Sequence, residues 1–227
     1  MIVAIHQPNY LPWAGYFQKI LKSDLFIFLD DAQFTKNSYI NRTKILQKNK
    51  NSWLTIPAKP KLGTPINEVM LSQCDWPKRH LDKLYNNYVD ANAFKTVWQD
   101  IQDIYVELPS SKLAESNILL IERICKMMGI KTKFSLSSMH KSKNNLFSEK
   151  RLVELVSVSG GSVYLSGRGA LAYQNKNTFD ISGIVLEYSE FEPKQYTQIA
   201  KDFVPGLSIL DVIFHLGWQG ATDYISV

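Results

Sequence analysis

Side chains that can do chemistry are concentrated in the stretch IHQPNYLPWAGYFQKI, which spans Ile5 to Ile20. His6 follows a short β-branched run, so we expect it at the carboxyl end of a strand, where an imidazole can act as a general base or hold a phosphate. A lone histidine is also common as a structural group. We expect His6 to be the general base of an active site. The neighbours expected to bind substrate are Gln7, Asn9, Tyr10 and Trp13, whose two aromatic rings would stack on a base or a sugar.

Two adjacent carboxylates are the next candidates. The run LFIFLDD, Leu25 to Asp31, is typical of a buried strand that ends in Asp30 and Asp31. Adjacent side chains of an extended chain point to opposite faces, so one carboxylate can be buried near His6 while the other is not. We expect Asp30 or Asp31 to orient His6 or to bind the substrate. The alternative is a solvated turn or a helix cap.

A basic segment, TKNSYINRTK, interleaves Lys36, Tyr39, Arg42 and Lys44 with amides such as Asn41. Arginine grips a phosphate or a carboxylate through two parallel hydrogen bonds, so the segment predicts an anion clamp. A solvated basic face is the plainer alternative. Single-stranded RNA also binds to surfaces that mix basic and aromatic side chains.

A second anion-binding candidate is the segment YLSGRGALAY, in which two glycines flank Arg168 directly after an expected strand. Backbone amides in such a loop can receive a phosphate. The segment lacks the GKS/T of a Walker A loop and a full GxGxxG, so Arg168 is what favours an anion site over a plain turn. Nucleophilic catalysis has little support: we expect Cys74 to be an inert thiol, Cys125 to lie in the core and His215 to be structural.

The elements around these residues predict how they are positioned. Ile2 to Ile5 reads as a strand, Trp13 to Leu21 has apolar residues at helical spacing, and Leu25 begins the second strand. This order predicts a parallel pair of strands with a ligand at their carboxyl ends.

The middle of the chain predicts a different arrangement. Residues 41–46 and 53–56 read as a hairpin with a turn at 49–52, and 66–71 as a further β-like stretch. Helices are expected from Asp75, over 93–106 and over 113–128, where Gly129 ends the last one. The last third alternates again, with strands at 133–137, 163–166 and 183–188, a helix at 148–157 and a final helix in LSILDVIFHLGWQGA. We therefore expect one α/β domain over residues 1–227, a mostly parallel sheet with flanking helices, and a β-hairpin and helical insert around 36–130.

Composition limits the class of protein. The chain has 227 residues, 45% of them hydrophobic and 21% charged, which is ordinary for a globular protein. A net charge of +5 and a pI near 9.0 suit an anionic ligand but do not demand nucleic acid. The two cysteines have neither a CxxC pattern nor a histidine at metal-ligand spacing, so we expect reduced thiols and no metal site. We see no signal peptide and no apolar run long enough to span a membrane, and expect a cytoplasmic protein.

Five segments together resemble the WbqC-like family: HQPNYLPWAGYF, DLFIFLDDAQFTKNSYINR, WLTIP, YLSGRGALAY and FVPGLSILDVIFHLG. The likeness runs from His6 to about Gly217. The motif positions that the resemblance carries over are His6, Gln7, Tyr10, Trp13, Asp30, Asp31, Gln33, Asn41, Arg42, Ser166, Gly167 and Asp211. His215 stands where we expect an asparagine in relatives, and relatives need no cysteine at position 74.

The resemblance also implies a role. Members of the family commonly lie in bacterial gene clusters for O-antigen and related surface polysaccharides. This implies an enzyme that tailors a nucleotide-linked amino sugar, by attaching a small acyl or aminoacyl group such as glycyl. In such a reaction His6 would be the base, and Arg42 with Arg168 would hold a diphosphate or a carboxylate.

Two other readings stay open. The opening also has a fold-level analogy with ligases such as pantoate–β-alanine ligase, which would bring in ATP, although the HxGH signature of those enzymes is missing here. Alternatively, the protein is a non-catalytic binder of a sugar nucleotide or of RNA that assists another enzyme. An aminoacyl-tRNA donor would join the basic charge to amide chemistry.

Overall fold

The computed structural model describes residues 1–109, 111–140, 148–172 and 174–227. Its central element is a five-stranded sheet with the order β5-β2-β1-β6-β7, in which every pairing is parallel. Counted along the chain, these strands take the order 3-2-1-4-5, which is that of a doubly wound α/β fold. The predicted fold class is confirmed. The strands are β1 (Ile2–His6), β2 (Leu25–Phe28), β5 (Lys133–Leu136), β6 (Val163–Gly167) and β7 (Val185–Ser189).

The opening of the chain folds as the sequence predicts. Helix α1 (Ala14–Leu21) connects β1 to β2, and the two strands pair in parallel from Val3↔Leu25 to His6↔Phe28. Because side chains alternate along a strand, Ala4, Phe26 and Phe28 face the α1 side of the sheet, and Val3, Ile5 and Ile27 face the other.

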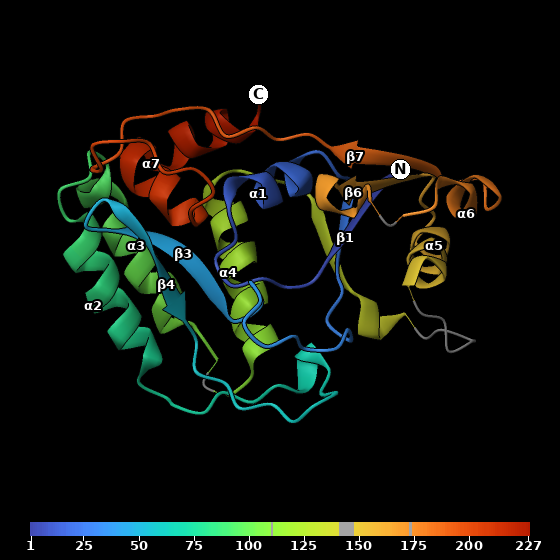
Figure 1. The fold of residues 1–227 in the computed structure, drawn as a ribbon, viewed down its shortest axis with the longest axis horizontal. Coiled ribbons are helices and arrows are strands. Elements are labelled where there is room, and N and C mark those ends of the chain that lie inside the picture. Colours follow the sequence, from blue (N-terminus) through green and yellow to red (C-terminus); the bar gives the residue numbers. More distant parts are fainter. Residues whose placement is uncertain (110, 141–147, 173) are drawn as a thin grey trace.

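Helices cover both faces of the sheet (Figure 1). The larger core packs under α1, α4 (Leu113–Met127) and α7 (Ile209–Ile225). The smaller core packs under α5 (Ser148–Val158) and α6 (Lys176–Asp180), and the second of these helices is not predicted by the sequence. Within the residues that the structure describes, no helix has both the length and the apolar character needed to cross a membrane.

Between β2 and β5 the chain makes a long insert. It contains an antiparallel hairpin of β3 (Arg42–Gln47) and β4 (Lys50–Thr55), then helices α2 (Trp76–Tyr88) and α3 (Phe94–Val106). The hairpin is confirmed, but its turn is tighter than predicted. Gln47 pairs with Lys50, so only two residues, both with positive φ, form the turn, which is the geometry that suits the twist of a hairpin.

One predicted strand is wrong. Residues 66–71 contain a short 3₁₀ helix, Ile66–Glu68, followed only by isolated bridges at Met70 and Leu71. Ile66 and Val69 are both fully buried. Their spacing of three suits a helical turn that puts both side chains on one side, whereas a strand would put them on opposite faces.

Candidate active site

A crevice opens where the order of the strands reverses, between β1 and β6. The β1–β6 ladder ends at Ala4↔Leu165, whereas β1 stays paired with β2 to His6 and β6 stays paired with β7 to Gly167. The two central strands therefore separate at their carboxyl ends. In doubly wound sheets, ligands bind in this crevice.

Two cavities occupy the crevice and its rim, and His6 and Trp13 line both of them. The larger cavity, about 550 Å³, is also lined by Gln7 and Asn9 and by residues of the insert. The smaller cavity, about 260 Å³, extends to β6 and β7. The smaller cavity is also lined by Tyr16, Lys19, Gly167, Arg168, Gly169 and Ser189.

The geometry of His6 favours a neutral imidazole. Its Nδ1 lies 3.0 Å from the carbonyl oxygen of Gln7, and because a carbonyl only accepts, Nδ1 carries the proton. Nε2, with no partner among the described residues, is then an acceptor. Burial, and next the charge of Lys19, lower the pKa of His6 to about 3. This favours a role as hydrogen-bond acceptor over the general-base role that the sequence predicts, because a base of such low pKa holds a proton poorly at neutral pH.

Lys19 is the charged residue of the smaller cavity that the sequence analysis missed, and Tyr16, Gly169 and Ser189 of the same cavity were also not predicted. It belongs to α1 and is only 3% exposed, and its Nζ donates a hydrogen bond to the carbonyl oxygen of Ile5, 3.2 Å away. That carbonyl lies one residue beyond the end of the β1–β6 ladder. Burial lowers the pKa of Lys19 to about 7. The helix packs against both β7 and α7, so a position that looks polar in the sequence is buried.

Trp13 stands between the two cavities. Its ring packs edge-on against Phe191, with 5.5 Å between ring centroids, and 39% of the residue stays exposed. A β-carbon at position 15 would lie 2.5 Å from the Trp13 ring, so Gly15 is what allows the indole to lie over the start of α1.

Replacing Gly15 with alanine should therefore displace the Trp13 ring. We expect the tryptophan emission of the unliganded protein to shift, and the shift to disappear in a Trp13→Phe background. Gly169→Ala is the matched control in the same crevice, because a β-carbon there meets open space. Identical emission spectra for Gly15→Ala and the wild type would contradict this placement of the indole.

Part of the wall of the larger cavity comes from the insert. Tyr39 and Lys44 line it, as the predicted anion clamp requires. Arg42 does not: its guanidinium lies 4.0 Å from the centroid of the Trp53 ring and donates to the backbone of Asn37. Lys44 is therefore the cation of this segment that lines the cavity, and its Nζ lies 5.6 Å from the centroid of the same Trp53 ring.

The β6 end supplies the other cation. Gly167 and Arg168 line the smaller cavity, and the exposed Arg168 makes a 3.4 Å ion pair with Glu192. Ser166 is buried, with 1% of its surface exposed, and lines neither cavity. The predicted anion site at this loop is thus partly assembled, from Arg168 and the backbone at Gly167.

The expectation that Tyr10 stacks on a ligand is not met by this structure. Tyr10 is fully buried, and its hydroxyl lies 2.7 Å from both His80 Nδ1 and the Tyr105 hydroxyl. His80 has a second partner in the carbonyl oxygen of Thr55, 3.0 Å from its Nε2, so both ring nitrogens hold it in place. Tyr10 anchors the loop after β1 to α2 and α3 instead of facing a substrate.

Asp30 and Asp31 line neither cavity of the crevice. As predicted, one is buried and the other exposed, but the buried Asp30 accepts hydrogen bonds from Asn67, Ser137 and Ser138. Asp31 accepts from Ser137 and pairs with Arg151 at 3.2 Å. These carboxylates tie the end of β2 to the segment after β5, and the geometry does not bring them together with His6.

Three more predicted contacts lie outside both cavities. Gln33 and Lys36 are exposed, and Asn41 donates to the carbonyl of Ile56, with its own side-chain oxygen buried and unpaired. Of the predicted site and the predicted anion clamp, eight residues line the two cavities: His6, Gln7, Asn9, Trp13, Tyr39, Lys44, Gly167 and Arg168.

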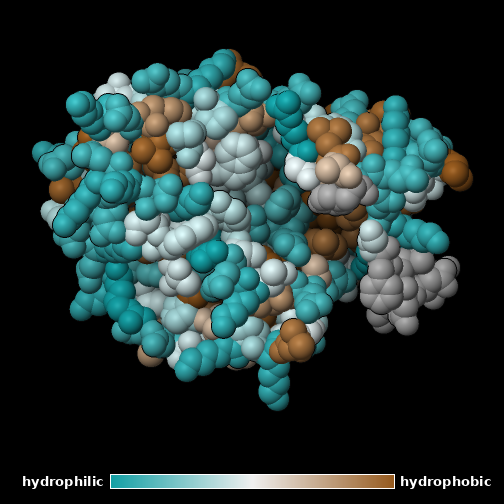
Figure 2. All heavy atoms as spheres, viewed as in Figure 1, coloured by the Kyte–Doolittle hydropathy of each residue, from teal (hydrophilic) through white to brown (hydrophobic). Residues whose placement is uncertain are grey.

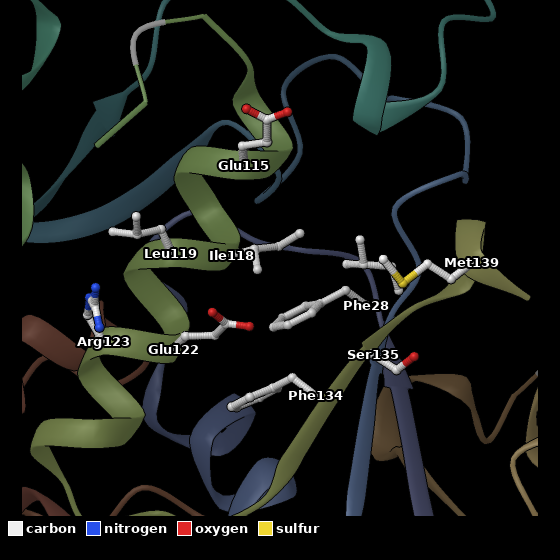
Figure 3. A pocket seen from close by; sticks show the side chains of 10 residues that line it. Phe28, Glu115, Ile118, Leu119, Glu122, Arg123, Phe134, Ser135 and Met139 are labelled. Atoms are coloured by element: carbon white, nitrogen blue, oxygen red, sulfur yellow. The ribbon is translucent and has the colours of Figure 1, made fainter. Parts of the chain in front are cut away.

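A third cavity, about 480 Å³, lies between α4 and β5 (Figure 3). Phe28 and Phe134 stack there with 5.4 Å between centroids, and the Glu122 carboxylate points toward the rings. Burial raises the pKa of Glu122. No predicted site residue lines this third cavity. On the face of the molecule that Figure 2 shows, hydrophilic side chains dominate the surface, and hydrophobic side chains are visible in a recess to the right of the centre.

Asp211 belongs to a buried network, not to the crevice. Its carboxylate accepts hydrogen bonds from Tyr88 at 3.0 Å, Tyr196 at 2.5 Å and Gln198 at 2.8 Å. His215 donates from Nδ1 to the Asp211 carbonyl and accepts at Nε2 from the backbone of Ile199, consistent with its predicted structural role. The network fastens the 190–208 segment to α7 and α2.

The doubly wound sheet defines an α/β protein, and the crevice lined by cationic side chains lies at its switch point, where folds of this class bind their ligands. The chain matches the WbqC-like protein family over residues 7–223, and it belongs to that family. It is also similar to the uncharacterized protein Rv1507c of Mycobacterium tuberculosis (strain ATCC 25618 / H37Rv). The two are 33% identical over 226 residues, which cover 98% of this chain and 96% of the relative.

Proposed function

We propose that the protein is a group-transfer enzyme that forms an amide on a nucleotide-linked amino sugar, as a tailoring step for a bacterial surface polysaccharide. The observation that supports this most is that two cavities share His6 and Trp13. A transfer reaction needs two substrates whose reacting atoms meet, and holding both in place supplies much of the catalysis. The resemblance to the family adds the class of substrate.

In this reaction the larger cavity holds the amino sugar, and the smaller one holds the reacting end of the activated acyl or aminoacyl donor. The amine nitrogen forms a bond to the acyl carbon, the bond from that carbon to the donor's leaving group breaks, and the amine proton leaves with the departing group. His6 Nε2 accepts a hydrogen bond from the amine and so aims its lone pair. Lys44 and Tyr39 contact the nucleotide, and Arg168 contacts an anionic part of the donor.

Replacing His6 with alanine should lower kcat by about 100-fold or more, because misplacement of a reacting atom by 1 Å has an effect of that order. The KM for the sugar nucleotide should change little, since the nucleotide contacts remain. The assay is mass spectrometry of the product from nucleotide-linked amino sugars with acyl thioesters, aminoacyl-tRNA, or amino acids with ATP as donors.

The matched control is His140→Gln. His140 lies outside both cavities, and its Nε2 forms a 3.0 Å hydrogen bond with the hydroxyl of Ser135. Unchanged kcat in His6→Ala, or an equal loss in the control, would refute the role given to His6. If no donor and acceptor pair yields an amide, the proposed function itself fails.

A second candidate, RNA binding, is favoured by one surface. Tyr39 and Trp53 are 44% and 37% exposed, and the centroids of their rings lie 5.5 Å apart. The guanidinium of Arg42 stacks on the Trp53 ring. Such a platform can stack on single-stranded bases. Binding of unrelated RNA that weakens steeply with salt would support this candidate, because contacts to phosphate release counterions. Salt-tolerant binding of a sugar nucleotide alone would exclude it.

A further inference from the structure

We propose that the smaller cavity binds one oxyanion, a phosphoryl or a carboxylate group, and that Lys19 takes up a proton when this anion binds. The inference deepens the proposed function and rests on it only for the identity of the substrate. The chemical group that the smaller cavity recognises is then an oxyanion, and the protonation of Lys19 makes its binding sensitive to pH.

The charges around the smaller cavity favour an anion. Lys19 and Arg168 line it together with His6, and its described lining contains no aspartate or glutamate. Gly167 and Gly169 leave room for a ligand beside the backbone, because a β-carbon at either would meet nothing within 4 Å. At about 260 Å³, the cavity suits a single charged group and is small for a whole nucleotide.

Lys19 has unused hydrogen-bonding capacity in the cavity. An ammonium group has three donors, and the structure gives Nζ one hydrogen-bond acceptor, the carbonyl of Ile5. Lys19 forms no ion pair with any described carboxylate, and it is 97% buried. A buried charge without a counter-charge is unfavourable, which is why burial lowers the pKa of this amine to about 7. A bound anion supplies the missing counter-charge and favours the protonated form.

Among the described groups that face Lys19, none changes its charge near neutral pH, whereas Lys19 does. On β1, the pKa of His6 is lowered to about 3, and on α1, burial raises the pKa of Tyr16 well above its usual value. The guanidinium of Arg168 stays charged. Phe26 on β2 has its ring centroid 5.8 Å from Nζ, and Ser189 on β7 lines the same cavity. Glu192 pairs with Arg168 and does not line the cavity.

The test follows the ¹³Cε resonance of Lys19 by NMR, assigned by its absence in Lys19→Arg, between pH 5 and 10. Sodium sulfate serves as the probe for a phosphoryl group and sodium acetate as the probe for a carboxylate, each against sodium chloride at equal ionic strength. Both probes stay ionised around pH 7, where Lys19 is expected to titrate. In chloride we expect a midpoint near 7. At about ten times its dissociation constant, a probe that binds only the protonated form should raise this midpoint by about one.

The probe that raises the midpoint identifies the class of oxyanion. Two variants complete the test. Lys19→Arg should bind that probe with an affinity that does not change between pH 6 and 8, whereas the affinity of the wild type should fall about tenfold across this interval. Lys22→Met, on the exposed end of the same helix, should behave as the wild type. A midpoint that neither probe moves, or equal probe affinity in Lys19→Met and the wild type, would overturn the inference.

This titration needs no turnover, so its failure is separable from that of the proposed function. A midpoint raised by sulfate or acetate, with no amide formed from any substrate pair, would leave the oxyanion subsite standing and remove the transfer reaction. Amide formation with a midpoint that neither probe moves would support the transfer reaction and rule out the oxyanion subsite.

Discussion

Replacing Lys19 with methionine should make the protein more stable at pH 6, by about 3 kcal/mol. The Lys19 pKa falls from 10.5 to about 7 on folding, and at 1.36 kcal/mol per pKa unit this corresponds to about 5 kcal/mol against the folded state at low pH. Methionine fills a similar volume without the charge. The carbonyl of Ile5 then loses its partner, which costs about 1–2 kcal/mol and leaves the expected net gain.

The sign of the pH dependence follows from proton binding. Between pH 7 and 10.5 the unfolded chain holds the Lys19 proton and the folded chain does not, so the stability that Lys19 contributes rises with pH. The advantage of Lys19→Met should therefore be full below pH 7 and shrink toward zero near pH 10. Urea unfolding at pH 6, 8 and 10 measures it, with Lys22→Met as the exposed control. A variant less stable than the wild type at pH 6 would contradict the prediction.

Replacing Asp211 with alanine should destabilise the protein by about 3–5 kcal/mol, the range found when one partner of a buried polar network is removed. The carboxylate is fully buried, and three donors converge on it: Tyr88, Tyr196 and Gln198. Burial, and then the charge of Asp211, raise the pKa of both tyrosines, so they remain protonated donors. Removal of their acceptor leaves buried hydroxyl and amide groups unpaired.

Thermal unfolding should show this loss as a midpoint lowered by about 10 °C, because about 1 kcal/mol corresponds to 2–4 °C in a chain of this size. Asp211→Asn separates charge from shape, since the amide keeps one acceptor oxygen and turns an N–H toward the remaining donors. It should lie between the alanine variant and the wild type. The control is Asp223→Ala, an exposed residue of the same helix whose partner is Gln219. Equal midpoints for Asp211→Ala and Asp223→Ala would contradict a stabilising role of the network.

Local patterns predicted much of the fold. The order of strand, helix and strand in the first thirty residues gave the parallel pair and placed His6 at its carboxyl end, because both follow from short-range periodicity. The turn at 66–69 was misread, because two buried residues three apart also fit a short apolar run. The full strand order depends on contacts between segments more than a hundred residues apart, which no local pattern contains.

The candidate site was predictable where a residue ends a strand or directly follows one, as with His6, Gly167 and Arg168. It was not predictable where burial decides the role. Tyr10 looks like a ligand-stacking ring in the sequence, yet α2 and α3 cover it, and Lys19 looks like a solvated helix residue, yet helix and strand enclose it. Both outcomes depend on elements that come later in the chain or lie elsewhere in the fold.

The insert between β2 and β5 supplies Tyr39 and Lys44 to one cavity only, whereas Lys19 and Arg168 belong to the sheet core and its first helix. The insert therefore contributes to the larger cavity alone, whereas the N-terminal stretch that contains His6 and Trp13 contributes to both. Under the proposed function, substitutions in the insert would change which acceptor is selected without altering the donor side. Such an arrangement would let a lineage diversify the sugars that it modifies while the chemistry of the attached group stays the same.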